Sequence, residues 1–187
     1  MKNIFSLPKL SVQRLVTLTM LIALSFIVGK FSISIIPQQL VVSLTFIVNT
    51  MIGMVAGPVW SFITLGLYDI VDNLSGGTGN FIIWWTLVEA VQGFFYGYFF
   101  YGKSLDWENK KDWIHVGIAT AVVMLIGTFI FTPLLIQIYY GTPIIAQYIA
   151  GRWLKIFEIP IRIVLTMLII PQLQRIPELR KLVSISK

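Results

Sequence analysis

The residues that could do chemistry gather in one short stretch of the chain, YDIVDNLSGGTGNFIIWWTLVEA, at residues 68–90. Asp69 and Asp72 are three residues apart, and Trp85 and Glu89 are four apart, so each pair would share one face of a helix. Acids and aromatic rings placed together are what a cavity for a polar organic solute requires. Each acid taken singly also allows a structural role, since Asp69 could cap or bridge helices and Asp72 could lie in water.

Two neighbouring features allow both a functional and a structural interpretation. Trp84 and Trp85 are adjacent, so their side chains would point about 100° apart on a helix, and at most one could stack on a ligand. Tryptophan also lines membrane interfaces, which is the alternative for either ring. The loop SGGTGN, residues 75–80, lacks the GxxxxGK[ST] pattern of a nucleotide-binding loop. It is therefore either a flexible turn or a gate over a ligand.

A second charged cluster, farther along the chain, contains Lys155, Glu158 and Arg162 at spacings of three and four. The structural interpretation is that Glu158 forms an ion pair with Lys155 or Arg162 inside the protein. The chain has no cysteine and one histidine, His115, and we find neither a metal-ligand pattern nor a nucleophile–base pair. The sequence therefore predicts no catalytic residues, no metal and no cofactor, and an enzyme is not expected.

The composition indicates that these residues belong to an integral membrane protein. Of 187 residues, 57% are hydrophobic and only 12% are charged, and the mean hydropathy is +0.84. A soluble domain is about a quarter charged. The net charge of +6 would suggest nucleic acid for a soluble protein. Here Lys and Arg lie mainly outside the apolar segments, which predicts contact with membrane lipid and no nucleic acid.

The apolar segments predict an all-α membrane protein with six transmembrane helices in a single domain, residues 1–187. The expected spans are about 12–29, 40–56, 59–72, 81–101, 114–139 and 153–173. The dipeptide Gly57–Pro58 predicts a tight break between the second and third spans. The third span is short for the ~30 Å hydrocarbon core.

The distribution of Lys and Arg predicts the orientation. With both termini in the cytoplasm, ten of the fourteen Lys and Arg residues lie inside: Lys2, Lys9, Arg14, Lys103, Lys110, Lys111, Arg175, Arg180, Lys181 and Lys187. The outer connections are then about 31–39, 73–80 and 140–152. Any outer ligand site must be built from these connections and the outer halves of the helices.

Four stretches of the chain carry a resemblance to a known family. TMLIALSFIVGKFSIS has two small residues four positions apart, Thr19 and Ala23, and then a basic–Phe–Ser sequence. GMVAGPVWSFITLGLYDIVDNL has a Gly-Pro turn and then a helix ending in Asp. NFIIWWTLVEAVQGFFYGYFFYG has a Gly-x-x-Tyr-Gly pattern near its end. TPLLIQIYYGTPIIAQYIAGRWLKIFEIPIRIVL has Tyr-Gly, Arg, Lys and Pro in that order. Together they resemble the substrate-binding (S) components of energy-coupling factor (ECF) vitamin importers, with the folate-type group most similar.

The resemblance implies a protein that captures folate outside the cell and delivers it inward. Its partners would be a transmembrane coupling protein and two ABC ATPases, and its location the cell membrane of a Gram-positive bacterium. A pterin ring has an N–H edge that carboxylates can bind, which suits Asp69 and Glu89. Trp84 or Trp85 would cover the ring, and the anionic tail of folate would suit Lys30, Arg152 or Lys155.

The resemblance also implies a docking surface on the first helix. Thr19 and Ala23 are one turn apart, and small residues at this spacing let two membrane helices approach closely. The matching Ala-x-x-x-Ala face of the family meets the coupling protein, and Thr19 stands where the first Ala is usual. The Thr19 hydroxyl can bond back to its own helix. From spacing alone, packing within the protein is the alternative.

Two other functions remain open at this point. The same transport machine could carry pantothenate or a B6-type vitamin, although pantothenate has no ring and no cationic edge for the acids to bind. A structural or assembly membrane protein without a substrate is the alternative of another class.

Overall fold

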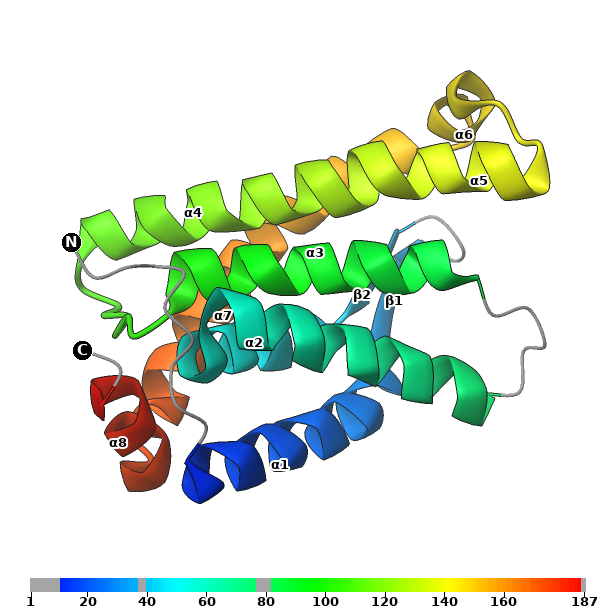
Figure 1. Cartoon of the computed structure of the whole chain (residues 1–187). Coiled ribbons are helices and arrows are strands. Elements are labelled where there is room, and N and C mark those ends of the chain that lie inside the picture. The colour runs from blue at the N-terminus through cyan, green and yellow to red at the C-terminus, as the bar shows by residue number, and fades with distance from the viewer. Residues whose placement is uncertain (1–10, 37–39, 77–81, 186–187) are drawn as a thin grey trace.

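The computed structural model describes residues 11–36, 40–76 and 82–185, and these are mainly helical (Figure 1). In chain order the elements are α1 (Val12–Gly29), β1 (Ser32–Ile36), β2 (Leu40–Ser43), α2 (Thr45–Gly76), α3 (Ile83–Phe100), α4 (Lys110–Met124), the π-helix η1 (Leu125–Phe131), α5 (Thr132–Tyr140), α6 (Ile144–Ile149), the 3₁₀-helix η2 (Arg152–Phe157), α7 (Glu158–Leu173) and α8 (Pro177–Ile185).

A short antiparallel hairpin interrupts the helical architecture after α1. β1 pairs with β2, with Ser32 opposite Ser43 and Ile33 opposite Val42. Residues 40–43 were expected to begin the second span, and the structure corrects this expectation. The segments SISII and LVVS are rich in β-branched residues, which favour extended backbone over helix.

The break predicted at Gly57–Pro58 divides α2 into two segments. Gly57 has φ +76°, a left-handed conformation that a residue with a Cβ atom rarely adopts. Pro58 can begin the next segment because the first turn of a helix needs no N–H donor at that position. The hydroxyl of Ser61 donates to the carbonyl of Ile52 at 3.3 Å, across the turn. The second segment therefore folds back along the first.

The backbone of α3 lies directly against α2. At three glycines, an added Cβ atom would come within 2.6 Å of backbone in the other helix: Gly53, Gly93 and Gly97. At Gly97 the Cβ atom would lie 2.5 Å from backbone atoms of both Gly57 and Pro58, and at Gly93 it would lie 2.5 Å from the carbonyl oxygen of Ser61. Only glycine allows such an approach, so these three positions set the distance between the two helices.

Figure 1 shows that the molecule has two ends. The start of α1, the connection from α3 to α4, and α8 lie together at what we call the terminal end. The hairpin, the end of α2, the start of α3 and the turn from α5 to α6 lie toward the opposite, hairpin end. Within the described ranges, three helices are long and apolar enough to cross a membrane: Val12–Gly29, Thr45–Ser75 and Lys110–Tyr140. The last expected span, about 153–173, is divided, because residues 152–157 form η2 and α7 begins at Glu158.

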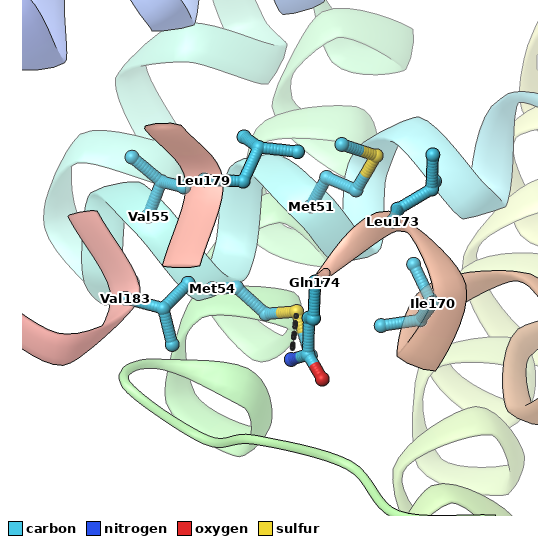
Figure 2. Close-up of a pocket in the computed structure, with 8 residues that line it drawn as sticks. All are labelled: Met51, Met54, Val55, Ile170, Leu173, Gln174, Leu179 and Val183. Carbon is cyan, nitrogen blue, oxygen red and sulfur yellow. Dashed lines mark hydrogen bonds between the residues drawn. The ribbon is translucent and has the colours of Figure 1, made fainter. Parts of the chain in front are cut away.

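At the terminal end, α8 packs against α2 and the end of α7 around a cavity of only about 10 Å³ (Figure 2). The Gln174 amide donates to the sulfur of Met54 at 3.5 Å and to the carbonyl of Lys103 at 3.0 Å. Its oxygen accepts from the backbone N–H of Leu105 at 3.0 Å. Gln174 therefore fastens the connection between α3 and α4 to α7 and α2. The cavity beside it is too small and too apolar for an organic ligand.

The glycine contacts predict a stability difference between matched alanine substitutions. Gly93→Ala and Gly97→Ala should each lower the free energy of unfolding by about 1–3 kcal/mol, because the new methyl group meets backbone that cannot move aside. Gly117→Ala in α4 is the control, since its Cβ atom would meet Ile163 Cδ1 at an ordinary 3.8 Å. Thermal unfolding of the purified proteins in detergent measures the difference. Equal unfolding temperatures for all three variants would contradict the close contact.

Candidate ligand-binding site

A polar cavity of about 490 Å³ opens between α1, β2, α2 and α3, toward the hairpin end. Its volume is within the range of sites for small organic ligands. Most of its lining residues have polar side chains, in contrast to the rest of the protein: Phe26, Gly29, Lys30, Ser43, Thr45, Asn49, Tyr68, Asp69, Asp72, Ser75 and Glu89. The start and the end of α2 both contribute lining residues, because its two segments lie side by side and bring these ends together.

Two of the acids that line the cavity are held by side chains of α3. The Thr86 hydroxyl donates to Asp69 Oδ2 at 2.6 Å, which joins α2 to α3. The Gln92 amide donates to Glu89 Oε1 at 3.1 Å. Each carboxylate thus has one oxygen engaged and another that can accept a hydrogen bond from a ligand. No group of three or more His, Cys, Asp or Glu side chains in the described ranges could hold a metal ion.

Lys30 supplies a positive charge at the same cavity. It is the C-cap of α1 and is exposed, so its ammonium group can move within the opening. Asp72 is also exposed at this edge, whereas Asp69 and Glu89 are half-buried. The structure therefore brings together Lys30, Asp69 and Glu89, three of the residues that the sequence singled out. A ligand with an N–H edge and an anionic group would find partners for both.

The aromatic side chains at the cavity are Phe26 and Tyr68, which the sequence analysis missed. Their ring centroids are 4.9 Å apart and their planes are inclined by 55°. The Tyr68 hydroxyl also lies near Gly29, where an added Cβ atom would be 3.2 Å from it. A signal was available in the sequence, because Tyr68, Asp72 and Ser75 follow one another at the spacing of one helical face.

Trp84 and Trp85 are not among the described residues that line the cavity. Trp84 has 51% of its surface exposed, and Trp85 is half-buried. Trp84 precedes Glu89 by five residues, so it points away from the face of α3 that carries this acid. Trp85 shares that face but lies one turn closer to the start of the helix.

Arg152 and Lys155 lie in η2, which packs beside β2, and β2 ends at the cavity residue Ser43. Arg152 Nη1 donates to Gln147 Oε1 at 2.7 Å. Burial lowers the pKa of Arg152, although a guanidinium group stays charged at any physiological pH. Neither cation belongs to the described lining of the cavity. Both cations lie in η2, next to the strand β2 that reaches the cavity.

The second charged cluster contains the ion pair that its spacing predicted. Arg162 Nε donates to Glu158 Oε1 at 2.7 Å, and the guanidinium carbon of Arg162 lies 4.9 Å from the centre of the Phe46 ring. Glu158 is 99% buried, and an unpaired carboxylate there would be strongly destabilising. The predicted ion pair between Glu158 and Arg162 is therefore confirmed.

Asn49 is a further cavity residue that sequence reasoning missed. It lines the cavity, only 8% of its surface is exposed, and its Oδ1 atom has no hydrogen-bond partner among the described residues. Buried side-chain amides are usually fully bonded, so an open acceptor in a polar cavity suits a bound ligand or water. The available signal was an Asn within the apolar run TFIVNTMIG.

Thr19 and Ala23 lie outside the cavity, on an exposed face of α1. The Thr19 hydroxyl donates to the carbonyl of Leu15 at 3.0 Å, as the sequence predicted, so it presents little polarity to a neighbour. Leu18, Leu21 and Ser25 form the buried face of the same helix. The pair is therefore accessible to another protein or to lipid.

Comparisons with known proteins agree on one family. The family model described as "ECF transporter, substrate-specific component" matches residues 13–170. The "Folate transporter FolT" of Streptococcus mutans serotype c (strain ATCC 700610 / UA159) is 73% identical over 184 residues, which cover 98% of this chain and 99% of that protein. The "Folate transporter FolT" of Leuconostoc mesenteroides subsp. mesenteroides is 24% identical over 152 residues, or 79% of this chain and 78% of its own.

A solved structure has the same fold. It is described as "Crystal structure of FolT bound with folic acid", and it superimposes with a TM-score of 0.71. The two sequences are 28% identical, and the match covers 84% of this chain and 93% of the other. The overall fold of this chain is thus already known from an experimental structure.

The bond between Thr86 and Asp69 predicts the effect of removing one hydroxyl. Thr86→Val should lower the free energy of unfolding by about 1–3 kcal/mol, because Asp69 loses a donor while its charge remains half-buried. Thr50→Val is the matched control: Thr50 is equally buried, but its hydroxyl donates to the carbonyl of Phe46 within the same helix. Chemical or thermal unfolding without ligand measures both. A larger loss in Thr50→Val would show that the Thr86–Asp69 bond contributes little.

Proposed function

The chain belongs to the family of ECF transporter substrate-specific components, and on that premise we propose that it captures folate at the outer face of the cell membrane. The family is one of transporter components and not of enzymes. The 73% identity with a folate transporter over nearly the whole chain supports folate as the cargo. The observation that carries the proposal is the cavity itself, which combines two half-buried acids, an aromatic pair and a lysine.

The chemistry of folate matches these three kinds of side chain. The pterin ring is flat and has an N–H edge, which Asp69 and Glu89 would accept through their open oxygens. Phe26 and Tyr68 would contact the faces of the ring, where aromatic stacking contributes beyond burial alone. Lys30 would bind the anionic glutamate tail, with Arg152 and Lys155 in η2 extending the positive charge.

Of the two tryptophans, we propose that at most one contacts the ligand. Trp85, half-buried on the face that carries Glu89, is the better candidate to reach a bound ring. Trp84, with half of its surface exposed, suits the membrane interface. Pantothenate or a B6-type vitamin is the alternative cargo. Pantothenate has neither a flat ring nor a cationic edge, so it would use Asp69, Glu89 and the aromatic pair less fully than folate does.

The proposed orientation has six spans and places both termini in the cytoplasm. The two segments of α2 count as two of the spans, together with α1, α3, α4 to α5, and α7. The start of α1 and α8 lie at the same end of the molecule in Figure 1, which supports an even number of spans. The cavity opens toward the opposite end, where a solute would arrive from outside. The cell membrane of a Gram-positive bacterium is the proposed location, since the first relative comes from Streptococcus.

Delivery would depend on partners that this chain does not contain. A transmembrane coupling protein and two ABC ATPases would supply the energy, and ATP would be hydrolysed on the ATPases. Thr19 and Ala23 would form the docking face, because small residues on an exposed helix face permit close approach of another helix.

The ligand assignment is tested by binding to the purified protein. Folic acid should bind saturably, and Asp69→Asn and Glu89→Gln should each weaken it by roughly 30-fold or more. Breaking a buried charged hydrogen bond costs about 2–5 kcal/mol, and about 1.4 kcal/mol corresponds to tenfold. Glu108→Gln, an exposed acid at the terminal end, is the control and should bind normally. Isothermal titration in detergent gives the dissociation constants.

Pantothenate and pyridoxine complete the experiment. Saturable binding of either compound, with none of folic acid, would transfer the assignment to the alternative cargo. Affinity close to that of the unmodified protein in both acid variants would remove Asp69 and Glu89 from the site.

The docking face is tested by separating uptake from binding. Ala23→Trp should abolish folate uptake in cells while the purified protein still binds folic acid, because a large side chain would stand where the partner helix approaches. Ile118→Trp, on the exposed surface of α4, is the control and should leave uptake unchanged. Loss of binding together with uptake would mean that Ala23 serves internal packing.

A further inference from the structure

Gln92 holds the acid Glu89 from behind the cavity. It lies one turn after Glu89 on α3, and its Nε2 atom donates to Glu89 Oε1 at 3.1 Å. Gln92 is half-buried and is not among the described residues that line the cavity. An ionised carboxylate can only accept, so the amide must present its nitrogen to Glu89. Glu89 lines the cavity, and the bond leaves its other oxygen, Oε2, able to accept from a ligand.

The Gln92 amide occupies the space beside Gly127, in the π-helix η1. A Cβ atom at Gly127 would lie 2.6 Å from Gln92 Cδ and 2.8 Å and 2.9 Å from its amide oxygen and nitrogen. The amide therefore packs directly on the backbone of this buried glycine. No other residue type leaves that space.

The π-helix provides this contact at a defined point. The Thr132 backbone N–H bonds to the carbonyl of Gly127, five residues earlier, and the Thr132 hydroxyl donates to the same oxygen at 2.8 Å. Two donors on one carbonyl fix the bulge at Gly127. Such one-turn bulges cost helix regularity and recur at functional sites. Here the bulge places the backbone of Gly127 against the side chain of Gln92, which bonds to Glu89.

We propose that Gln92 is a positioning residue for substrate recognition: it directs the second oxygen of Glu89 at the N–H edge of the ligand, and its amide fits there because residue 127 is a glycine. The inference rests on the proposed function, because it requires Glu89 to contact the substrate. Gln92 would then determine specificity from outside the cavity, and Gly127 would act on the ligand only through Gln92 and Glu89. Loss of either should misdirect Glu89 without removing any group that touches the ligand.

The test is a set of double-mutant cycles on the purified full-length protein, with folic acid as the probe. Gln92→Leu removes the donor and keeps the size, and Gly127→Ala displaces the amide. Each should raise the dissociation constant on the order of tenfold, as expected for a lost hydrogen bond to a charged group. Gly117→Ala, in α4 with room for its methyl group, should bind normally.

Two background variants separate positioning from general packing. With Glu89→Gln already present, Gln92→Leu should add less than about twofold, because interacting residues give non-additive effects. With Gln92→Ala already present, Gly127→Ala should add nothing, since the methyl group then has space. The second cycle keeps the test informative where Gly127→Ala alone folds poorly.

The outcomes distinguish this inference from the proposed function. A tenfold loss from Gln92→Leu that persists in the Glu89→Gln background overturns the positioning role and leaves folate binding by Glu89 intact. Normal affinity in Gln92→Leu also overturns it alone. Normal affinity in Glu89→Gln itself refutes the role of Glu89 in the proposed site, and the inference falls with it.

Discussion

The close contact between the backbones of α2 and α3 is the constraint on which the cavity depends. Gly53, Gly93 and Gly97 remove the side chains that would separate the helices, and the turn at Gly57 lets α3 touch both segments of α2. Membrane helices gain little from the hydrophobic effect against one another, so close van der Waals packing is their main attraction. This contact brings Thr86 of α3 within hydrogen-bond distance of Asp69.

Paired polar groups follow from that arrangement. Buried polar atoms in an apolar protein are costly unless they are bonded, and the acids here have partners on neighbouring turns or helices. Asp69 is bonded by Thr86 and Glu89 by Gln92, whereas Glu158 pairs with Arg162 away from the cavity lining. The pairs engage one oxygen each. Of these three acids only Asp69 and Glu89 line the cavity, and there each keeps one oxygen that can accept a further hydrogen bond.

The sequence predicted the acids of the site better than its aromatic side chains. Asp69 and Glu89 stood out because charges are rare in this chain, and Gly57–Pro58 marked the turn that brings them together. Phe26 and Tyr68 did not stand out, since 14% of the residues are aromatic and only the packing of α1 on α2 selects these two. Trp84 and Trp85 attracted attention by type, but the rotation of α3, which its glycines determine, turns Trp84 outward. The hairpin was missed because hydropathy does not separate an apolar strand from the start of an apolar helix.

The two walls of the cavity are built differently. The wall that carries Asp69, Asp72 and Glu89 belongs to α2 and α3, whose backbones approach closely at their glycines. The wall formed by α1 and its C-cap contributes only Phe26, Gly29 and Lys30. Gly29 faces the hydroxyl of Tyr68, so the width of the opening there depends on a single hydrogen atom in place of a methyl group. Small substitutions in α1 could therefore change the shape of the cavity, while the close contact between α2 and α3 stays the same.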